Sequence, residues 1–501
     1  MAVFAAAVRW GTFAAGGSDS YCYVHQAEAW ASGRLQVVEP LALDAPWPNP
    51  PLTFAPAGHI PSPTVRGAAV PMCPAGLSIA MAPLAYVGAA FRRPGALFAA
   101  VPLFGALLVW SVYVLGARFS PRVGLASALL VACSPAFLFQ LMQPMSDVPA
   151  AALWVLATVL ATSRRPGAPL LAGLATSAAI LVRPNLVPMG MVLGAYFLAQ
   201  GMRPALAFAA ASAPGCIAVA LIDQMFYGSP LRSGYGTLDG LFAFEHVAPN
   251  AARYFTWMSA THTPIWLLAL AAPFVLPRRL SALLLSLAAV NVLCYLPYMV
   301  FSDWWYLRFL LPAIAMALVL TAAVVDSLLR LWREPLWLAH GTSHKGLSHR
   351  VMMSLVTAGL AFLFLREARA RSVFELQRLE ARYARAGAYV ADHLPPNALV
   401  VTSWESGSVR FYGHRNTLVW DVLDPAWLDR AVAYTRTRGL EPYLLFERWE
   451  EPIFRQRFAG SVLGRLDWPP AAEIAGQVRI YRPDDRDRYF RGDAAPTEYA
   501  R

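Results

Sequence analysis

Charged residues are scarce in this chain: they make up 14% of its 501 residues, whereas a soluble protein carries about 25%. Lys345 is the single lysine. Cysteine is limited to five residues, which excludes a disulfide framework. Cys22 and Cys73 share one polar segment, where they either stay reduced or pair, if the segment faces an oxidising compartment. With 57% hydrophobic residues, this composition argues against a soluble enzyme or a disordered protein and indicates a many-pass membrane protein.

Most of the net charge of +11 belongs to the apolar part of the chain. Residues 1–365 hold 20 Lys and Arg against 11 Asp and Glu, whereas residues 366–501 hold 21 against 19. The basic residues of the first part form short clusters between apolar runs. We therefore expect a lipid bilayer, and no nucleic acid, as the partner of this charge.

Eleven apolar runs are candidate membrane spans, although several are shorter than the ~20 residues of a straight crossing. The first run is short and carries Arg9, so the true start is expected to lie either at Met1 or upstream of it. The runs are Ala2–Ala15, Ala96–Ala117, Val123–Met142, Val148–Thr162, Ala168–Val182, Leu186–Ala199, Ala205–Ile222, Thr263–Pro277, Leu280–Phe301, Phe309–Val325 and Val351–Leu365.

Five short connections carry basic residues and fall on one side if all eleven runs cross. The positive-inside rule makes that side the cytoplasm, which places the N-terminus inside and residues 366–501 outside. A further run, Ala75–Phe91, would reverse this arrangement if it crossed, so we predict that it lies at the outer membrane interface. The basic residues of the connections are Arg118, Arg122, Arg164, Arg165, Arg203, Arg278, Arg279, Arg330, Arg333, Lys345 and Arg350.

The sequence thus predicts a mainly α, polytopic membrane module over residues 1–365, with a first outer loop over 16–94, and a separate tail over 366–501. The tail alternates strand and helix patterns, which predicts a small α/β domain on the outer face. The expected strands are Ala398–Thr402, Thr417–Asp421 and Tyr443–Phe446, and the expected helix is Ala426–Arg438.

Acidic residues are few in the membrane module, and nine of its eleven face outward in this topology. An ionisable group at a membrane edge is either functional or simply solvated at the headgroup level. Asp19 stands out because it follows Gly16-Gly17, and glycines let the backbone approach a ligand closely. Asp147 lies at the outer mouth of two spans, but its place before Val148-Pro149 also fits a helix N-cap.

Several short motifs occur in order between residues 16 and 325. Together they resemble the type C membrane glycosyltransferases, the superfamily of dolichyl-phosphate-mannose protein mannosyltransferases and bacterial aminoarabinose transferases. Relatives often carry a second acid beside the first-loop aspartate, where this chain has Ser20, so a metal site built on paired carboxylates is not expected, although a divalent cation stays open. The motifs are Gly17-Ser18-Asp19-Ser20-Tyr21, Ala27-Glu28-Ala29-Trp30, Ser32-Gly33-Arg34-Leu35, Pro71-Met72-Cys73-Pro74-Ala75-Gly76-Leu77, Ser146-Asp147-Val148-Pro149, Ile180-Leu181-Val182-Arg183-Pro184, Tyr227-Gly228-Ser229-Pro230 and Tyr306-Leu307-Arg308-Phe309-Leu310-Leu311-Pro312.

The resemblance implies a type C glycosyltransferase fold in a bacterial inner membrane. It also implies transfer of a sugar from a polyprenyl-phosphate donor to a lipid, glycan or protein acceptor at the periplasmic face. A carboxylate takes the acceptor proton, and we assign this role to Asp19. The leaving phosphate needs positive charge and hydrogen-bond donors. Arg183 and Arg308 fit, since each lies at the outer end of a predicted span, where an arginine also snorkels to headgroups without further role. The other expected substrate-binding residues are Asp147, Tyr235 and His59.

Two other functions remain open at this point. A transporter usually shows related halves and ionisable groups near the bilayer midplane, and neither feature is visible here. A non-catalytic relative that binds a lipid-linked glycan agrees with Ser20 beside Asp19. In the tail, Trp404–Arg410 is either a polar binding loop or the start of a helix capped by serine.

Overall fold

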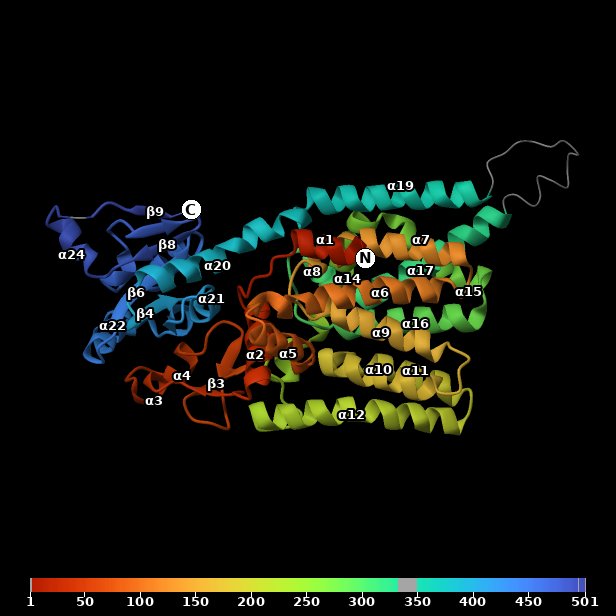
Figure 1. Ribbon diagram of the computed structural model, residues 1–501, viewed down its shortest axis with the longest axis horizontal. Coiled ribbons are helices and arrows are strands. Elements are labelled where there is room, and N and C mark those ends of the chain that lie inside the picture. The colour runs from red at the N-terminus through yellow and green to blue at the C-terminus, as the bar shows by residue number, and fades with distance from the viewer. Residues whose placement is uncertain (1, 332–348, 494, 501) are drawn as a thin grey trace, which may run out of the picture. The chain divides into compact units, whose positions relative to one another are not determined.

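The computed structural model describes residues 2–331, 349–493 and 495–500 (Figure 1). These residues form two compact units, each assembled from three separate stretches of the chain. Arg333 and Lys345, two of the basic residues used to predict the orientation, lie outside the described residues. Unit 1 comprises Met1–Gly11, Phe98–Leu221 and Gly236–Leu376, and unit 2 comprises Thr12–Leu97, Ile222–Tyr235 and Gln377–Arg501.

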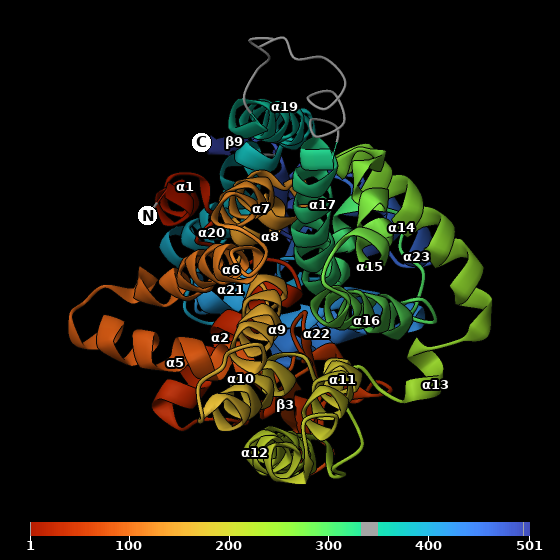
Figure 2. The same ribbon diagram turned by 90° about the vertical axis from the view of Figure 1, so that its right-hand side faces the viewer.

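Unit 1 is a bundle of helices. Seen along the bundle, α9 lies between α6 and α10 (Figure 2). The segment Trp304–Leu331, which ends in α17, is 89% buried over its most apolar window, so it forms the centre of the bundle. Small residues permit the close approach of neighbouring helices: a Cβ added to Gly124 would lie 2.7 Å from the carbonyl oxygen of Tyr113. The helices are α1 (Ala2–Trp10), α6 (Ala100–Gly116), α7 (Pro121–Cys133), α8 (Pro135–Leu141), α9 (Asp147–Ala161), α10 (Ala168–Val182), α11 (Val187–Leu198), α12 (Met202–Tyr227, which continues into unit 2), α14 (Val247–His262), α15 (Ala272–Val275), α16 (Arg278–Tyr295), α17 (Leu311–Leu331) and α19 (His349–Ala370).

Every predicted span contains helix, but the predicted number of eleven is not confirmed. The described residues contain five helices long and apolar enough to cross a membrane, or seven if each of two bent pairs counts as one span. The bends measure 61° and 106°. The first run forms only the nine-residue α1, and α9 and α10 have 15 residues each, too few for a straight crossing. The five are Gly95–Gly116, Met202–Tyr227, Arg278–Tyr295, Trp304–Leu331 and His349–Ala370, and the pairs are Pro121–Cys133 with Pro135–Leu141 and Phe244–His262 with Pro264–Val275.

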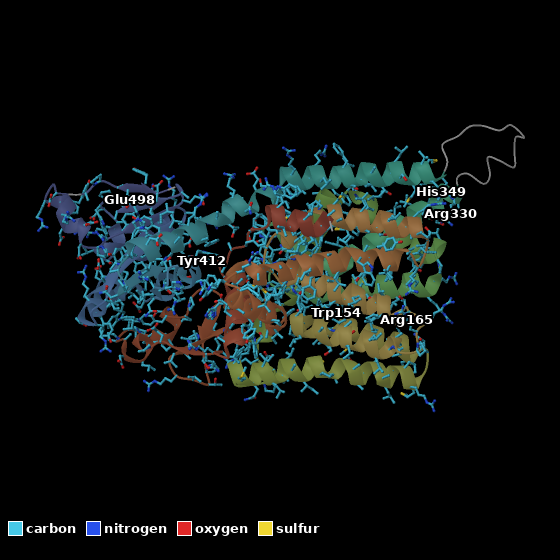
Figure 3. The ribbon with its side chains drawn as sticks, viewed as in Figure 1. Trp154, Arg165, Arg330, His349, Tyr412 and Glu498 are labelled. Carbon is cyan, nitrogen blue, oxygen red and sulfur yellow. A yellow bond between two sulfur atoms is a disulfide. The ribbon has the colours of Figure 1, made fainter. Side chains whose placement is uncertain are left out.

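Basic residues of the predicted cytoplasmic connections meet at one end of unit 1. Figure 3 places Arg165 and Arg330 at the same end of the helices, with His349 beside Arg330. Asp326 is buried there, accepts a hydrogen bond from Arg330 and lies 3.1 Å (Oδ1) from His349 Nε2. Arg165 precedes α10 and Arg330 lies in the last turn of α17, so the opposite ends of these two helices point away from this basic end.

Unit 2 combines most of the first outer loop with the tail. In the loop, the helices α2 and α5 pack against each other beside a three-stranded antiparallel sheet of order β1-β3-β2. Cys22 on α2 and Cys73, just before α5, form a disulfide with a Cα–Cα distance of 6.2 Å. One of the two open alternatives for these cysteines is therefore confirmed. The elements are α2 (Asp19–Ser32), β1 (Val37–Val38), α3 (Leu41–Asp44), α4 (Pro50–Thr53), β2 (His59–Pro61), β3 (Ala68–Pro71) and α5 (Ala75–Ala90).

The tail is an α/β domain, as predicted, around a six-stranded sheet of order β5-β4-β6-β8-β7-β9. β4 pairs in parallel with β5 and β6, and β6 pairs antiparallel with β8. One core cluster of the tail also takes in side chains of the first loop: Trp47 and Phe54 belong with Leu399 and Trp420. The tail elements are α20 (Leu376–His393), β4 (Ala398–Thr402), α21 (Ser406–Phe411), β5 (Asn416–Val419), α22 (Leu428–Thr437), β6 (Glu441–Glu447), α23 (Glu450–Arg457), β7 (Ala472–Ile474), β8 (Val478–Tyr481), α24 (Asp485–Phe490) and β9 (Glu498–Ala500).

Loss of the Cys22–Cys73 disulfide should destabilise unit 2. The crosslink joins residues 51 positions apart, and closing a loop of that size removes about 4 kcal/mol of chain entropy from the unfolded state. We expect the double variant Cys22→Ser/Cys73→Ser to unfold at a clearly lower temperature than the wild type in a thermal melt. Cys216→Ser, at an exposed free cysteine, is the control. Equal melting temperatures of the double variant and the wild type would contradict the prediction.

Candidate functional site

Asp147 and Arg183 form a buried ion pair in unit 1. Asp147 is the first residue of α9, only 2% exposed, and its Oδ1 accepts a hydrogen bond from Arg183 Nη2. Its Oδ2 has no hydrogen-bond partner among the described residues. The carboxylate therefore binds a guanidinium, and the simple N-cap interpretation of Asp147 does not describe its contacts.

The guanidinium groups of Arg183 and Arg308 lie near the same aromatic ring. Arg183 donates a 2.7 Å hydrogen bond to the hydroxyl of Tyr295, at the end of α16. The ring of Tyr295 stacks on Phe309 with 4.8 Å between centroids. The guanidinium carbons of Arg183 and Arg308 lie 5.3 Å and 5.1 Å from the centroid of that same Phe309 ring. Both arginines that were predicted to bind phosphate thus lie near the ring of Phe309. The net charge of these two arginines and Asp147 is positive.

Asp147, Arg183 and Arg308 each lie at or near a helix junction. Asp147 begins α9, Arg183 immediately precedes the short helix η2 (Pro184–Leu186), which runs into α11, and Arg308 lies in η5 (Trp304–Leu310), which runs into α17. Helix N-termini carry partial positive charge and free backbone N–H groups, which favour bound anions. Since Arg183 follows α10 and Arg308 precedes α17, the group lies at the helix ends opposite the basic end of unit 1. Binding of a phosphate by this positively charged group stays a prediction.

Asp19 begins α2 in unit 2 and is partly exposed. The two glycines before it are required by their surroundings. A Cβ on Gly16 would lie 2.1 Å from the ring of Tyr383, and Gly17 has a φ of +58° with the Tyr383 hydroxyl 3.3 Å from its Cβ position. The glycine turn before Asp19 is therefore packed directly against the tail.

His59 lies on β2, near the start of α2. A Cβ on the neighbouring Gly58 would lie 2.4 Å from the carbonyl oxygen of Ser18, so the two backbones are in contact. His59 is 6% exposed, and its Nε2 lies 3.0 Å from Nδ1 of His25. Burial, followed by the charge of Arg410, lowers the pKa of His25 to about 4. Burial, followed by the charge of His25, holds the pKa of His59 well below its usual value. Both rings are neutral at pH 7, and one donates to the other.

The other sequence candidates have different surroundings. Tyr235 is 38% exposed, and the glycine before it packs tightly on the backbone of Met72. α21 begins at Ser406, as the helix-start interpretation predicted, but no serine side chain caps it. Instead Ser406 Oγ accepts a 2.9 Å hydrogen bond from the N–H of Ala57 in the first loop.

Sequence reasoning missed the residues that hold the candidates in place. Tyr295 and Phe309 lie in apolar runs, where an aromatic residue gives no sign of a function. Phe309 could have been noticed because it directly follows Arg308 in the motif Tyr306–Pro312. Arg410 is partly buried and donates hydrogen bonds to Thr417 and to the carbonyl oxygen of Phe54. The residues around Arg410 could not have shown this contact, because its partner Phe54 lies in a distant segment of the sequence.

The tail also contains a cavity of about 270 Å³, on the side of the sheet that carries α20. Its wall includes Tyr389, Trp468, Arg482 and Glu498, and Figure 3 labels Glu498 near the C-terminus of the chain. The Tyr389 hydroxyl donates a 2.8 Å hydrogen bond to Glu498. None of the residues predicted for the site lines this cavity.

No group of three or more His, Cys, Asp or Glu side chains within the described ranges is placed to hold a metal ion. The geometry therefore offers the positively charged group of Asp147, Arg183 and Arg308 in unit 1 and the carboxylate of Asp19 in unit 2 as its chemical elements.

Comparison with known proteins matches part of the chain to one protein family and nearly all of it to several solved structures. Residues 90–225 match the family described as dolichyl-phosphate-mannose-protein mannosyltransferase. No curated protein sequence matches the chain. This stretch includes both members of the ion pair, Asp147 and Arg183, but neither Asp19 nor Arg308.

Solved structures share the fold across nearly the whole chain. ArnT from Cupriavidus metallidurans bound to undecaprenyl phosphate matches with a TM-score of 0.54 and 13% identity, over 96% of this chain and 97% of that one. The oligosaccharyltransferase of Archaeoglobus fulgidus gives a TM-score of 0.52 and 12% identity, over 94% and 72%. The arabinofuranosyltransferase AftD from Mycobacteria gives 0.51 and 15%, over 96% and 41%. The chain thus resembles the type C glycosyltransferases in fold, as its motifs predicted.

Proposed function

We propose that this protein transfers a sugar from a polyprenyl-phosphate donor to an acceptor at the outer face of a membrane. The observation that carries the proposal is the arrangement of Arg183 and Arg308 on one phenylalanine ring, beside the carboxyl group of Asp147 at the start of α9. This positive group suits a phosphate diester and, still better, the phosphate with added negative charge that leaves in the reaction. The family match and the fold shared with ArnT agree with such a donor.

The reaction is a displacement at the anomeric carbon. An acceptor hydroxyl forms the new bond to that carbon as the bond from the carbon to the phosphate oxygen breaks. The acceptor proton passes to the carboxylate of Asp19, acting as general base. The electron pair leaves with the polyprenyl phosphate, whose increased charge the two arginines and the helix N-termini stabilise. Asp147 is a positioning residue, because its contact is with Arg183.

The proposed location is a bacterial inner membrane, with the N-terminus in the cytoplasm and the tail in the periplasm. The Cys22–Cys73 disulfide supports this orientation, since a disulfide persists in an oxidising compartment. The basic end of unit 1 supports it as well, because positive residues favour the cytoplasmic side. The donor is proposed to be an undecaprenyl-phosphate sugar, and His59 and Tyr235 are proposed as further contacts to the substrates.

The proposal is tested by supplying membranes that contain the protein with a panel of radiolabelled polyprenyl-phosphate hexoses and pentoses. Label should move from at least one donor into a new product, and membranes without the protein should not form it. If every donor stays intact, the proposal fails. Delivery of an intact donor across sealed proteoliposomes would instead support the transport function.

A further inference from the structure

The parallel part of the tail sheet has a topological switch point. β4 lies between β5 and β6, and the chain leaves β4 through α21 to reach β5 on one side, then returns through α22 to β6 on the other. In open α/β sheets, ligands bind at the carboxyl ends of the strands where the order reverses in this way. The residues at that place are Trp404 and Glu405, after β4, and Glu447, Trp449 and Glu450, at the end of β6.

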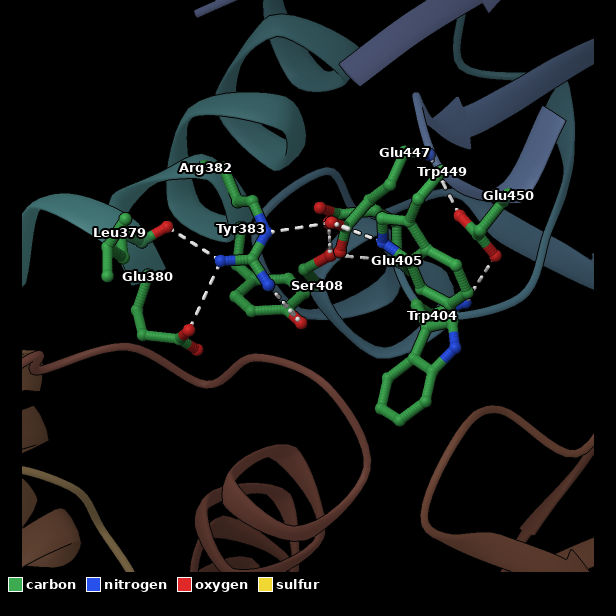
Figure 4. A network of polar contacts seen from close by, with 10 residues as sticks. All are labelled: Leu379, Glu380, Arg382, Tyr383, Trp404, Glu405, Ser408, Glu447, Trp449 and Glu450. Atoms are coloured by element: carbon green, nitrogen blue, oxygen red, sulfur yellow. Dashed lines mark hydrogen bonds and ion pairs between the residues drawn. The ribbon is translucent and has the colours of Figure 1, made fainter. Parts of the chain in front are cut away.

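Two tryptophan rings are exposed at this switch point. Trp404 is 43% and Trp449 49% exposed, and their ring centroids are 5.9 Å apart at an interplanar angle of 64° (Figure 4). Both are fixed by carboxylates: the indole N–H of Trp449 donates a 2.9 Å hydrogen bond to Glu447 Oε2, and the backbone N–H of Trp404 donates to Glu450 Oε1. The rings are thus preorganised.

Carboxyl oxygens with unused hydrogen-bonding capacity lie beside the rings. Glu405 is 0% and Glu447 5% exposed, and Oε1 of each has no hydrogen-bond partner among the described residues. The remaining oxygen of Glu447 accepts a 3.0 Å bond from Arg382 (Figure 4). Burial is the main cause that raises the pKa of Glu405 to about 8 and that of Glu450 to about 7. Glu405 is therefore mainly protonated at pH 7 and able to donate, whereas Glu447 is able to accept.

These groups have the chemistry that sugar hydroxyls and sugar ring faces require. A flat aromatic ring covers the apolar C–H face of a pyranose, and a few placed polar groups fix its orientation. The local charge is acidic, because two carboxyl groups, those of Glu380 and Glu447, contact the one guanidinium of Arg382. An anionic headgroup or phosphate is disfavoured by such a site, which leaves a neutral or amino sugar as the matching ligand.

The position of the pair connects it to the candidate base. Gly17, two residues before Asp19, has its Cβ position 3.7 Å from the ring of Trp404 and 3.3 Å from the hydroxyl of Tyr383. Tyr383 in turn accepts a hydrogen bond from Arg382, the partner of Glu447. The tryptophan pair, its carboxyl groups and the Asp19 turn are thus one connected part of unit 2.

We propose that Trp404 and Trp449, with the carboxyl groups of Glu405 and Glu447 beside them, bind a sugar unit of the acceptor, so that the acceptor of this enzyme is a saccharide. The assignment of this sugar as the acceptor rests on the proposed transfer function, whereas its binding does not. A saccharide on the pair would place a neighbouring sugar toward the Asp19 turn.

Binding is tested without any donor, on the full chain in lipid nanodiscs. The probes are neutral and amino disaccharides of hexoses and N-acetylhexosamines, and saturation-transfer NMR reports their affinities. At least one disaccharide should bind, and Trp404→Ala and Trp449→Ala should each weaken it by about tenfold or more. Trp404→Tyr should keep most of the affinity. Tyr499→Ala, at a 76% exposed aromatic on β9, is the matched control and should change nothing.

Two results would overturn the inference. One is a panel in which no disaccharide binds, or binds equally well to the wild type and the tryptophan variants. The other is quenching of Trp404 and Trp449 by brominated lipids, found by comparison with the two Trp→Phe variants, which would make the pair a membrane anchor. Tryptophan-dependent binding without sugar transfer would support the sugar subsite and reject the proposed function. Sugar transfer that is unaffected by the Trp→Ala variants would support the proposed function and reject the subsite.

Discussion

The Asp19→Asn variant is expected to transfer sugar about 10²–10⁴-fold more slowly than the wild type, because the amide has the shape of the carboxylate but takes no proton. Asparagine is compatible with the first turn of a helix, so α2 should remain intact. The measurement is the initial rate of transfer from the donor identified in the panel, at equal amounts of inserted protein. Binding of the donor lipid, which needs the arginines of unit 1, should be unchanged.

Two controls separate catalysis from charge in the same loop. Asp44→Asn removes an acid of the first loop that is paired at 3.0 Å with Arg438 on the surface, and it should leave the rate unaltered. Asp19→Glu keeps a base with a longer side chain and should restore part of the activity. Equal rates for the wild type and Asp19→Asn would show that Asp19 is not the general base. Another carboxyl group of unit 2 would then have to take the acceptor proton.

The sequence predicts local elements of this fold well. The apolar runs locate the helices because membrane helices are apolar over their whole length, and β4 occupies the predicted residues Ala398–Thr402. The number of eleven spans is not confirmed, because apolar composition does not show where a helix ends or bends. The junction of α7 and α8 at Ser134-Pro135, with its 61° bend, lies inside one continuous apolar run.

Contacts between residues far apart in the chain could not be predicted from the sequence. Nothing in the polar loop around Trp47 indicates that this side chain shares a core with Leu399 and Trp420, more than 300 positions away. Glu405 shows the same limit for the candidate site. An acid between a strand and a helix is an ordinary helix start in sequence, and only the arrival of β6 beside β4 brings Glu447 to it.

The structure brings part of the predicted site together. Arg183 and Arg308 were chosen because they lie at the outer ends of predicted spans, and they do share the ring of Phe309. Their function as phosphate ligands stays a prediction, as does that of Asp19. Asp147 was predicted either to bind substrate or to cap a helix, and the structure shows it in an ion pair with Arg183. Substrate binding by Asp147 stays a prediction.

Arg183→Ala is expected to have a double effect, since the guanidinium both faces the proposed phosphate and neutralises Asp147. Loss of hydrogen bonds to a charged ligand costs about 1.5–3 kcal/mol, which corresponds to donor binding weaker by about 10- to 100-fold. Leaving the Asp147 carboxylate, 2% exposed, without its partner costs about 3–5 kcal/mol of stability as well. The single variant should therefore both melt at a lower temperature and lose donor affinity.

The double variant Arg183→Ala/Asp147→Asn separates these effects. It removes the uncompensated charge together with the arginine, so most of the stability should return while donor binding stays weak. Thermal melts with and without undecaprenyl phosphate measure both quantities, because a ligand stabilises the protein in proportion to its affinity. Asp147→Asn alone keeps Arg183 and should retain donor binding, with Arg183 less firmly placed. If the double variant is stabilised by the lipid as strongly as the wild type, Arg183 is a structural partner of Asp147, and the phosphate must be bound elsewhere.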